Sequence, residues 1–175
     1  MVEEILRQIE DKVVAAKRLT DEDALVLFEK AELGFLGRLA NISRERLNGN
    51  NVYFNRNFHL EPTNICIHNC LFCSYRRRVN EEGAWEMDKE AILNEVDRFK
   101  NQAVTEIHIV GGVHPQRDLE YYADILSSIK QKRPELHIKA FTAVELEFMI
   151  RKSKFSFKEG LLILKDAGLG SIPGG

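Results

Sequence analysis

All three cysteines of this 175-residue chain lie in one stretch, Cys66-Ile67-His68-Asn69-Cys70-Leu71-Phe72-Cys73, with the spacing C-x3-C-x2-C. The stretch follows a strand-like segment, Phe58–Thr63. Three thiolates so close in sequence can hold one metal centre without help from distant parts of the fold. An iron–sulfur cube prefers four thiolates, and the sequence has no fourth cysteine. A cube bound here would therefore keep one iron free for another ligand.

The residues by themselves leave other interpretations of the three cysteines open. A disulfide is disfavoured because the number of cysteines is odd and nothing indicates secretion. A structural zinc site that adds His68 or His59 is a rival, although zinc loops usually join two cysteine pairs that are far apart in sequence. Cysteines without any ligand are a third reading, which the polar neighbours Asn64 and Asn69 disfavour.

The cysteine spacing, with the aromatic Phe72 before the last cysteine, resembles the signature loop of the radical S-adenosylmethionine superfamily. The resemblance implies a [4Fe-4S] cluster on Cys66, Cys70 and Cys73, with the amino and carboxylate groups of S-adenosylmethionine on the remaining iron. An electron from the reduced cluster would cleave the sulfonium to methionine and a 5′-deoxyadenosyl radical. Phe72 would contact the adenine or pack beneath the cluster. The implied fold is a partial (β/α) barrel of the TIM type.

Composition and charge exclude several classes of function. The chain is 44% hydrophobic and 30% charged, with a formal charge of −2, which is ordinary for a soluble globular protein. This balance gives no electrostatic footprint for nucleic acid or a membrane, and we interpret the run Arg76-Arg77-Arg78 as solvated. No stretch approaches the ~20 apolar residues of a membrane span, and the charged first twenty residues contain no signal segment. We expect a cytoplasmic protein with neither nucleic acid nor membrane as a partner.

The first part of the chain, 1–50, predicts a helical extension outside the main domain. Apolar residues at helical spacing predict a helix over 2–18. Thr20 and Asp23 predict a capping-box start for a second helix. A third helix is predicted from about Phe35 through Ala40, with Leu47 as its furthest extent, before the turn Asn48-Gly49-Asn50.

The remainder, 51–175, alternates strands and helices. The predicted strands cover Val52–Phe54, Phe58–Leu60, 105–110, 136–142 and the beginning of a further strand at the glycine-rich end; the predicted helices follow Asp88 and cover 119–132, 143–150 and 157–167. The repeated strand–loop–helix order indicates an α/β fold with parallel strands.

About three βα units cannot close a barrel. We therefore expect the chain to be the amino-terminal part of a longer protein, whose other half continues in frame or is a separate chain. A complete three-stranded α/β domain is the alternative.

Residues after the second and third strands are further site candidates. Gly111 and Gly112 let the backbone approach a ligand or make a tight turn. Under the resemblance they lie against the methionine end of S-adenosylmethionine, although Val113 stands where the family usually has an acid. Glu145 is expected to reach the ribose or amino group of the cofactor, or to be an exposed helix cap. Four histidines without a visible partner carboxylate are interpreted as packing or surface residues: His59, His108, His114 and His137.

The segments Glu106–Pro115, His137–Glu145 and Asp166–Gly175 resemble the aminofutalosine synthases, although Gly170 stands where an aspartate is expected. This likeness implies addition of the 5′-deoxyadenosyl radical to 3-[(1-carboxyvinyl)oxy]benzoate, giving 6-amino-6-deoxyfutalosine and methionine in menaquinone biosynthesis. Dehypoxanthine futalosine cyclases and radical enzymes that make deazaflavin cofactors share parts of the pattern. The segment His137–Glu145 favours the synthase.

The implied partners are a small-molecule substrate and a reducing protein of the flavodoxin or ferredoxin type. Arginine is the natural ligand for the substrate carboxylates, and we expect such arginines outside this chain. Two readings without enzymatic activity stay open: a zinc-stabilised binding module and an inactive fragment.

Overall fold

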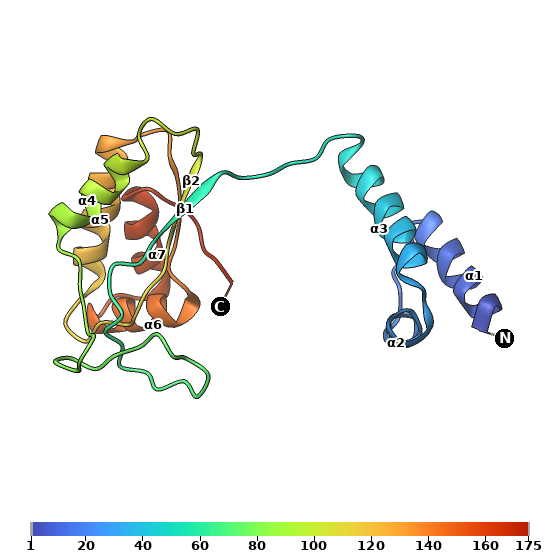
Figure 1. Ribbon diagram of the computed structural model, residues 1–175, viewed down its shortest axis with the longest axis horizontal. Helices are drawn as coiled ribbons and strands as arrows, with labels where there is room; N and C mark the ends of the chain where they lie inside the picture. Colours follow the sequence, from blue (N-terminus) through green and yellow to red (C-terminus); the bar gives the residue numbers. More distant parts are fainter. Residues whose placement is uncertain (1, 175) are drawn as a thin grey trace. The chain divides into compact units, whose positions relative to one another are not determined.

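The computed structural model of the protein describes residues 2–174. It contains two compact units, Met1–Phe54 and Asn55–Gly175 (Figure 1). The first unit contains helices followed by an irregular segment, and the second contains a parallel sheet with its helices. None of the helices within residues 2–174 is long and apolar enough to cross a lipid bilayer.

The first unit consists of three helices, α1 (Val2–Val14), α2 (Asp21–Lys30) and α3 (Leu33–Asn48). The predicted capping box at the start of α2 is confirmed. The Thr20 hydroxyl accepts the Asp23 N–H at 3.2 Å, and the Asp23 carboxylate accepts the Thr20 N–H at 2.9 Å. The buried part of this unit's core is small and comprises Ile9, Val13 and Leu39.

The prediction of a helix over 2–18 is wrong at its carboxyl end, because α1 stops at Val14. Ala16 adopts a left-handed φ of 56°. The Lys17 N–H then donates to the Lys12 carbonyl at 2.8 Å, and the Ala16 N–H donates to the Val13 carbonyl at 3.1 Å. These bonds are typical of a Schellman-type helix end, which the sequence conceals because alanine stands where glycine is usual.

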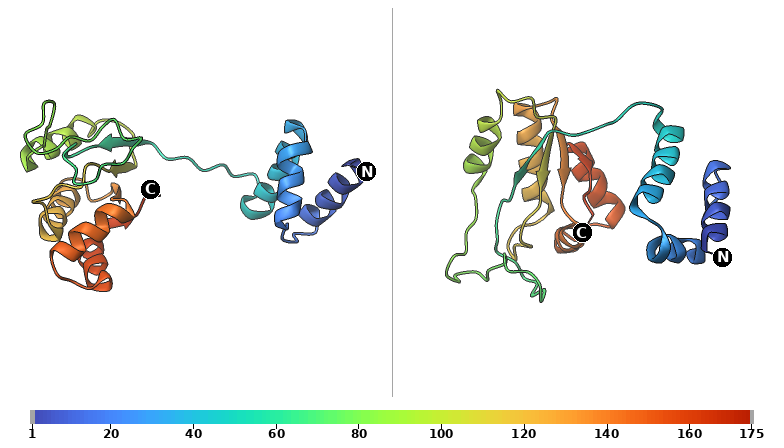
Figure 2. Two further views of the ribbon diagram at one scale, coloured as in Figure 1. Left: turned by 90° about the horizontal axis from the view of Figure 1, so that it is seen from below. Right: turned by 45° about the vertical axis from the view of Figure 1, so that its right-hand side comes forward.

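The second unit alternates strands and helices in the order β1 (Asn57–Leu60), α4 (Lys89–Arg98), β2 (Glu106–Ile109), α5 (Leu119–Lys132), β3 (His137–Ala140), α6 (Ala143–Lys152), α7 (Phe157–Asp166) and β4 (Leu169–Ser171). Neighbouring strands are parallel and lie in chain order, β1-β2-β3-β4. This order, with helices between the strands, confirms the predicted α/β class and partial barrel. In the right-hand view of Figure 2 the loops at the carboxyl ends of the strands gather at one end of the unit.

One face of the sheet carries the core. Ile107, Ile109 and Ile138 are at most 1% exposed and belong to a continuous apolar cluster with side chains from α4, α5, α6 and α7. Burying each such side chain contributes about 1.5–3 kcal/mol. Because side chains alternate along a strand, His108 and Lys139 belong to the opposite face.

The predicted strand Val52–Phe54 is wrong. This segment is irregular, and Phe54 is 81% exposed. Within residues 2–174 the sheet begins at Asn57 and offers Val52–Phe54 no partner strand. Aromatic and β-branched residues favour strands when they can pack on a sheet surface, and that surface is missing here.

Candidate active site

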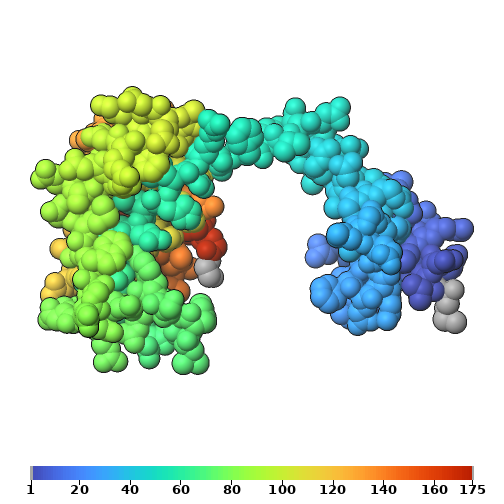
Figure 3. Space-filling view, viewed as in Figure 1, coloured from blue at the N-terminus to red at the C-terminus, as the bar shows by residue number. Residues whose placement is uncertain are grey.

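The loop between β1 and α4 brings the three cysteines to the carboxyl ends of the strands. Figure 3 shows this loop, in green, as a protruding part of the second unit. All three cysteines line one open cavity of ≈ 290 Å³. The other lining residues lie in the loop itself, just after β2 and β3, or in the first turn of α6: Glu61, His68, Tyr75, Val110, Gly111, Val113, Thr142, Val144 and Glu145. Active sites of parallel barrels lie at this end of the sheet, so the cysteine motif coincides with the usual site of the fold.

The backbone fixes the cysteines in two different ways. The Cys66 N–H donates to the Arg77 carbonyl at 2.9 Å, which joins the start of the loop to its return segment. The Cys73 N–H donates to the Cys70 carbonyl at 3.1 Å, so these two cysteines share a turn. Cys66 and Cys73 are half-buried, while Cys70 is exposed.

The three thiols around the cavity are the donor type that an iron–sulfur cluster takes. Among residues 2–174, no three histidine, cysteine or acidic side chains converge closely enough to hold one metal ion, as a tetrahedral zinc site requires. A cluster instead takes thiolates on separate irons, which three thiols around one cavity can supply. His59 lies outside this cavity. His68 lines it, and its Nε2 atom is buried without a hydrogen-bond partner in the described part of the chain.

Gly111 and Gly112 let two backbone segments touch. A Cβ atom on Gly112 would lie 2.2 Å from the Ile65 carbonyl oxygen, and one on Gly111 would lie 2.9 Å from the Thr63 carbonyl oxygen. The Gly112 N–H also donates to the Thr63 carbonyl at 2.7 Å. Neither glycine has a positive φ. The glycines are therefore needed for contact with the segment that leads to Cys66, and Gly111 alone of the pair lines the cavity.

Glu145 connects two strand ends beside the cavity. Its Oε1 atom accepts the Gly111 N–H at 3.1 Å, and its Oε2 atom accepts the Thr142 N–H and hydroxyl at 2.7 and 2.8 Å. Glu145 belongs to the capping box of α6, so the prediction of a helix-capping role is confirmed. The prediction that this cap is exposed is wrong, because only 8% of the residue is exposed. The Glu145 carboxylate therefore lies beside Gly111, although the sequence has Val113 at the position after the glycines where the family usually has an acidic residue.

Replacing Glu145 by glutamine is expected to change how stability depends on pH. Burial raises the pKa of the Glu145 carboxyl above its ordinary 4.5, outweighing the hydrogen bonds from Thr142 and Gly111 that lower it. The folded protein then binds more protons than the unfolded chain between the two pKa values, so this group's contribution to stability falls as pH rises through that range. We expect the unfolding free energy of Glu145→Gln, relative to the parent, to increase from acid to neutral pH in urea titrations. A difference that does not vary with pH would contradict this assignment.

Phe72 lies outside the cavity. Its exposed fraction is 94%, and the preceding Leu71 is also fully exposed. The structure therefore brings together the three cysteines, Gly111 and Glu145, whereas Phe72 and Gly112 do not line the cavity.

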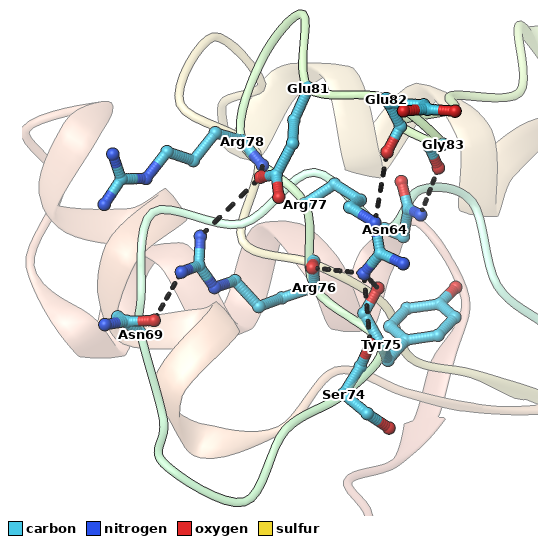
Figure 4. Close-up of polar contacts among 10 residues, drawn as sticks. All are labelled: Asn64, Asn69, Ser74, Tyr75, Arg76, Arg77, Arg78, Glu81, Glu82 and Gly83. Carbon is cyan, nitrogen blue, oxygen red and sulfur yellow. Dashed lines mark hydrogen bonds and ion pairs between the residues drawn. The ribbon is translucent and has the colours of Figure 1, made fainter.

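The interpretation of Arg76-Arg77-Arg78 as simply solvated is wrong for two of the three residues. Figure 4 shows the Arg76 side chain hydrogen-bonded to Asn69, which lies between Cys66 and Cys70 in the sequence. The Arg77 guanidinium donates at 2.9–3.2 Å to three backbone carbonyls, those of Ser74, Arg76 and Glu82. These two arginines therefore fasten the cysteine loop to itself and to the segment that follows it.

Arg77→Ala is expected to lower the unfolding free energy by about 1–2 kcal/mol, because three carbonyls lose a charged donor. The matched control is Arg78→Ala, since the Arg78 guanidinium has no hydrogen-bond or ion-pair partner among residues 2–174 (Figure 4). This control should stay within about 0.5 kcal/mol of the parent. Urea denaturation of both variants measures the difference, and equal effects would show that the carbonyl contacts do not hold the loop.

A half-buried ion pair, which no local sequence pattern indicates, joins the end of the cysteine loop to the segment before α5. The Arg117 Nε atom donates to Glu86 Oε1 at 2.5 Å. This bond lowers the pKa of Glu86, while burial lowers the pKa of His114. The His114 Nε2 atom lies 3.7 Å from Glu86 Oε2, so the expectation that no carboxylate accompanies the histidines is wrong here. Glu86 and Arg117 are 31 residues apart, and no local pattern links them.

Comparison with known proteins agrees with this geometry. The family model of the radical SAM superfamily matches residues 60–175. The aminodeoxyfutalosine synthase of Thermus thermophilus is 40% identical over 167 residues, covering 95% of this chain and 45% of the relative. The 5-amino-6-(D-ribitylamino)uracil–L-tyrosine 4-hydroxyphenyl transferase of Methanoculleus marisnigri is 34% identical, covering 97% of this chain and 47% of the relative.

A solved structure shares the fold. The crystal structure of methylornithine synthase superposes with a TM-score of 0.70 at 21% identity, over 95% of this chain and 46% of that protein. The chain thus spans about half the length of the curated relatives it matches. With the cysteine motif, the parallel sheet and the family match over most of the second unit, the chain belongs to the radical SAM superfamily.

Proposed function

We propose that the protein is a radical S-adenosylmethionine enzyme of the aminofutalosine synthase type. The observation that carries this proposal is the position of Cys66, Cys70 and Cys73 around one cavity at the carboxyl ends of parallel strands. The choice of the synthase is supported by the 40% identity to the Thermus thermophilus protein. The reaction would join the 5′-deoxyadenosyl group of S-adenosylmethionine to 3-[(1-carboxyvinyl)oxy]benzoate, releasing methionine and the substrate's enolpyruvyl carboxylate as carbon dioxide or bicarbonate.

In this proposal the three cysteine thiolates hold a [4Fe-4S] cluster. When bound, the cluster supplies the electron that cleaves S-adenosylmethionine. The chain's own residues bind and orient the cofactor. The half-burial of Cys66 and Cys73 limits access of water to their thiolates, and the hydrogen bonds of the loop hold the thiols in place.

Glu145 and Gly111 form the wall that we assign to S-adenosylmethionine. Both line the cavity, and Glu145 Oε1 accepts one hydrogen bond, from Gly111. A carboxylate oxygen can accept more than one hydrogen bond, so Glu145 retains capacity for the ribose hydroxyls or the amino group. Val110, Val113 and Val144 supply apolar surface, which suits a radical reaction that must exclude water.

The experiment uses anaerobic protein reconstituted with iron and sulfide, S-adenosylmethionine and dithionite. We expect about four irons per chain, cleavage of S-adenosylmethionine and, with the carboxyvinyl substrate, 6-amino-6-deoxyfutalosine by mass spectrometry. In the cell a reducing protein of the flavodoxin or ferredoxin type would replace dithionite. Protein that assembles no iron and cleaves no cofactor would overturn the proposal.

A second candidate function rests on the 34% identity to the tyrosine-dependent transferase. The same reconstituted protein is therefore also given L-tyrosine and 5-amino-6-(D-ribitylamino)uracil. A product from these substrates, with none from the carboxyvinyl substrate, would place the protein with the transferases. Cofactor cleavage in both mixtures would uphold the radical chemistry, and the product identifies the branch.

A further inference from the structure

The face of the sheet opposite the core carries two cross-strand rows of polar side chains. In the row nearer the amino ends, Asn57 pairs with Glu106, which pairs with His137. In the next row, nearer the carboxyl ends, His59 pairs with His108, which pairs with Lys139. We call this second set the basic row. Parallel sheets are normally covered on both faces. The side chains on this face therefore indicate which kind of group covers it.

The polar side chains of the first row have hydrogen-bond and charge partners within the row or on β4. The Glu106 carboxylate accepts the Asn57 side-chain N–H at 3.3 Å, and an oxygen of the same carboxylate lies 3.9 Å from His137 Nε2. The His137 Nε2 atom is also within hydrogen-bond distance, 2.8 Å, of the Ser171 hydroxyl. This row therefore contains its own acid and needs no ligand.

The basic row has no acid. The rings of His59 and His108 lie 4.8 Å apart between centroids. Within residues 2–174 neither these histidines nor Lys139 takes part in a side-chain hydrogen bond or ion pair. The His108 Nε2 atom is buried and has no partner. A buried polar atom without a partner is costly. The basic row therefore has the capacity to bind a further polar group.

The charges around His108 agree with this picture. Burial, His59 and Lys139 all lower the pKa of His108, and only Glu106 in the neighbouring row opposes them. Glu61 lies two positions after His59, just beyond the end of β1, but it forms no ion pair with the basic row in the described part of the chain. Glu106 therefore partly offsets the positive charge that His59 and Lys139 create around His108, but no carboxylate among residues 2–174 forms an ion pair with the basic row.

The basic row lies just beneath the candidate active site. Glu61 and Val110 line the cavity just beyond the ends of β1 and β2, and His59 and His108 precede them by two positions within these strands. Two residues of a strand span about 6.6 Å. A ligand whose reacting end occupies the cavity can therefore extend a second polar group down to the basic row.

We propose that His59, His108 and Lys139 bind a carboxylate of the substrate inside the partial barrel. This inference rests on the proposed function, whose substrate is already an aryl carboxylate, and it assigns the residues of this chain that would bind that carboxylate. It also changes the expectation that arginines outside this chain bind every substrate carboxylate. The alternative is that acidic side chains from elsewhere in the whole protein cover this face.

The test compares 3-hydroxybenzoate with the neutral 3-hydroxybenzamide by titration calorimetry on the reconstituted protein. We expect the acid to bind more tightly than the amide. Lys139→Met should weaken acid binding by about 10- to 100-fold, the range expected for a lost charge-assisted hydrogen bond, and His108→Gln should weaken it in the same direction. The matched controls, His137→Gln in the first row and Lys165→Met on exposed α7, should leave the affinity unchanged.

Equal binding of acid and amide would overturn the proposal. So would a Lys139→Met variant that loses unfolding free energy but keeps its affinity for the acid, because the row would then hold protein side chains instead of substrate. Cleavage of S-adenosylmethionine without substrate is measured on the same samples. If the parent protein cleaves the cofactor but shows no preference for the acid, this inference is wrong and the proposed function stands. If the protein assembles no iron, the proposed function itself is wrong.

Discussion

Replacing any one of Cys66, Cys70 and Cys73 by alanine is expected to reduce cleavage of S-adenosylmethionine by more than about 100-fold. The reason is that loss of even an outer partner of a metal ligand costs about 10- to 100-fold, and each cysteine is one of three thiols available in the chain. The measurements are iron content after anaerobic reconstitution and the yield of methionine with dithionite. Undiminished cleavage in any of the three variants would show that its thiol does not hold the cluster.

His68→Gln separates the cluster from the zinc alternative. His68 is the histidine that lines the cavity with the cysteines, so it would be the fourth ligand of a zinc site. Under the cluster assignment this variant keeps its iron and most of its cofactor cleavage. Under the zinc assignment the protein binds zinc in place of iron, and the variant loses that metal and unfolds more readily in chelator.

Local rules were sufficient for the starts of helices that have a predicted side-chain cap, whereas α3 begins at Leu33, two residues before the predicted Phe35, and its N-cap Glu32 forms no capping hydrogen bond. Asp88 was predicted as a cap, and its side chain accepts the Ala91 N–H at 2.8 Å. Such a contact spans three residues and needs only the right side chain beside the first helical turn. The end of α1 is equally local, but it escaped prediction because the left-handed residue is Ala16 and not a glycine.

The site was predicted as a motif but not as a structure. The cysteine spacing predicts a cluster loop, because such a loop concentrates its ligands in one short segment. The residues that hold this loop came from distant positions: Arg117 pairs with Glu86, and Glu145 accepts the Gly111 N–H. Their partners are set by the packing of strands and loops, which no periodicity in one sequence encodes.

The basic row illustrates the same limit. His59, His108 and Lys139 were each unremarkable in sequence, because a lone histidine or lysine on a strand is usually a surface or packing residue. Only the register of β1, β2 and β3 places them side by side. A one-residue shift in either pairing would send one of them to the other face of the sheet.

Gly112→Ala is expected to lower the unfolding free energy by about 3 kcal/mol or more, the range of severe overpacking against groups that cannot move aside. The added Cβ would lie 2.2 Å from the Ile65 carbonyl oxygen and 2.9 Å from the Asn64 carbonyl carbon. These are backbone atoms, so no side-chain rotation relieves the clash. Gly37→Ala is the control: that glycine lies in α3 with open space around it, and the change should stabilise the helix by about 0.5–1 kcal/mol.

The consequence of Gly112→Ala should extend to the candidate active site. The atoms that must move belong to Asn64 and Ile65, the residues immediately before Cys66. Displacing them breaks the hydrogen bond from the Gly112 N–H to Thr63 and shifts the first cysteine relative to the other two. Iron retention should therefore fall together with the urea midpoint, whereas Gly37→Ala should leave iron unchanged. A Gly112→Ala variant that is as stable as the parent and fully loaded with iron would mean that β2 does not support the cysteine loop through this backbone contact.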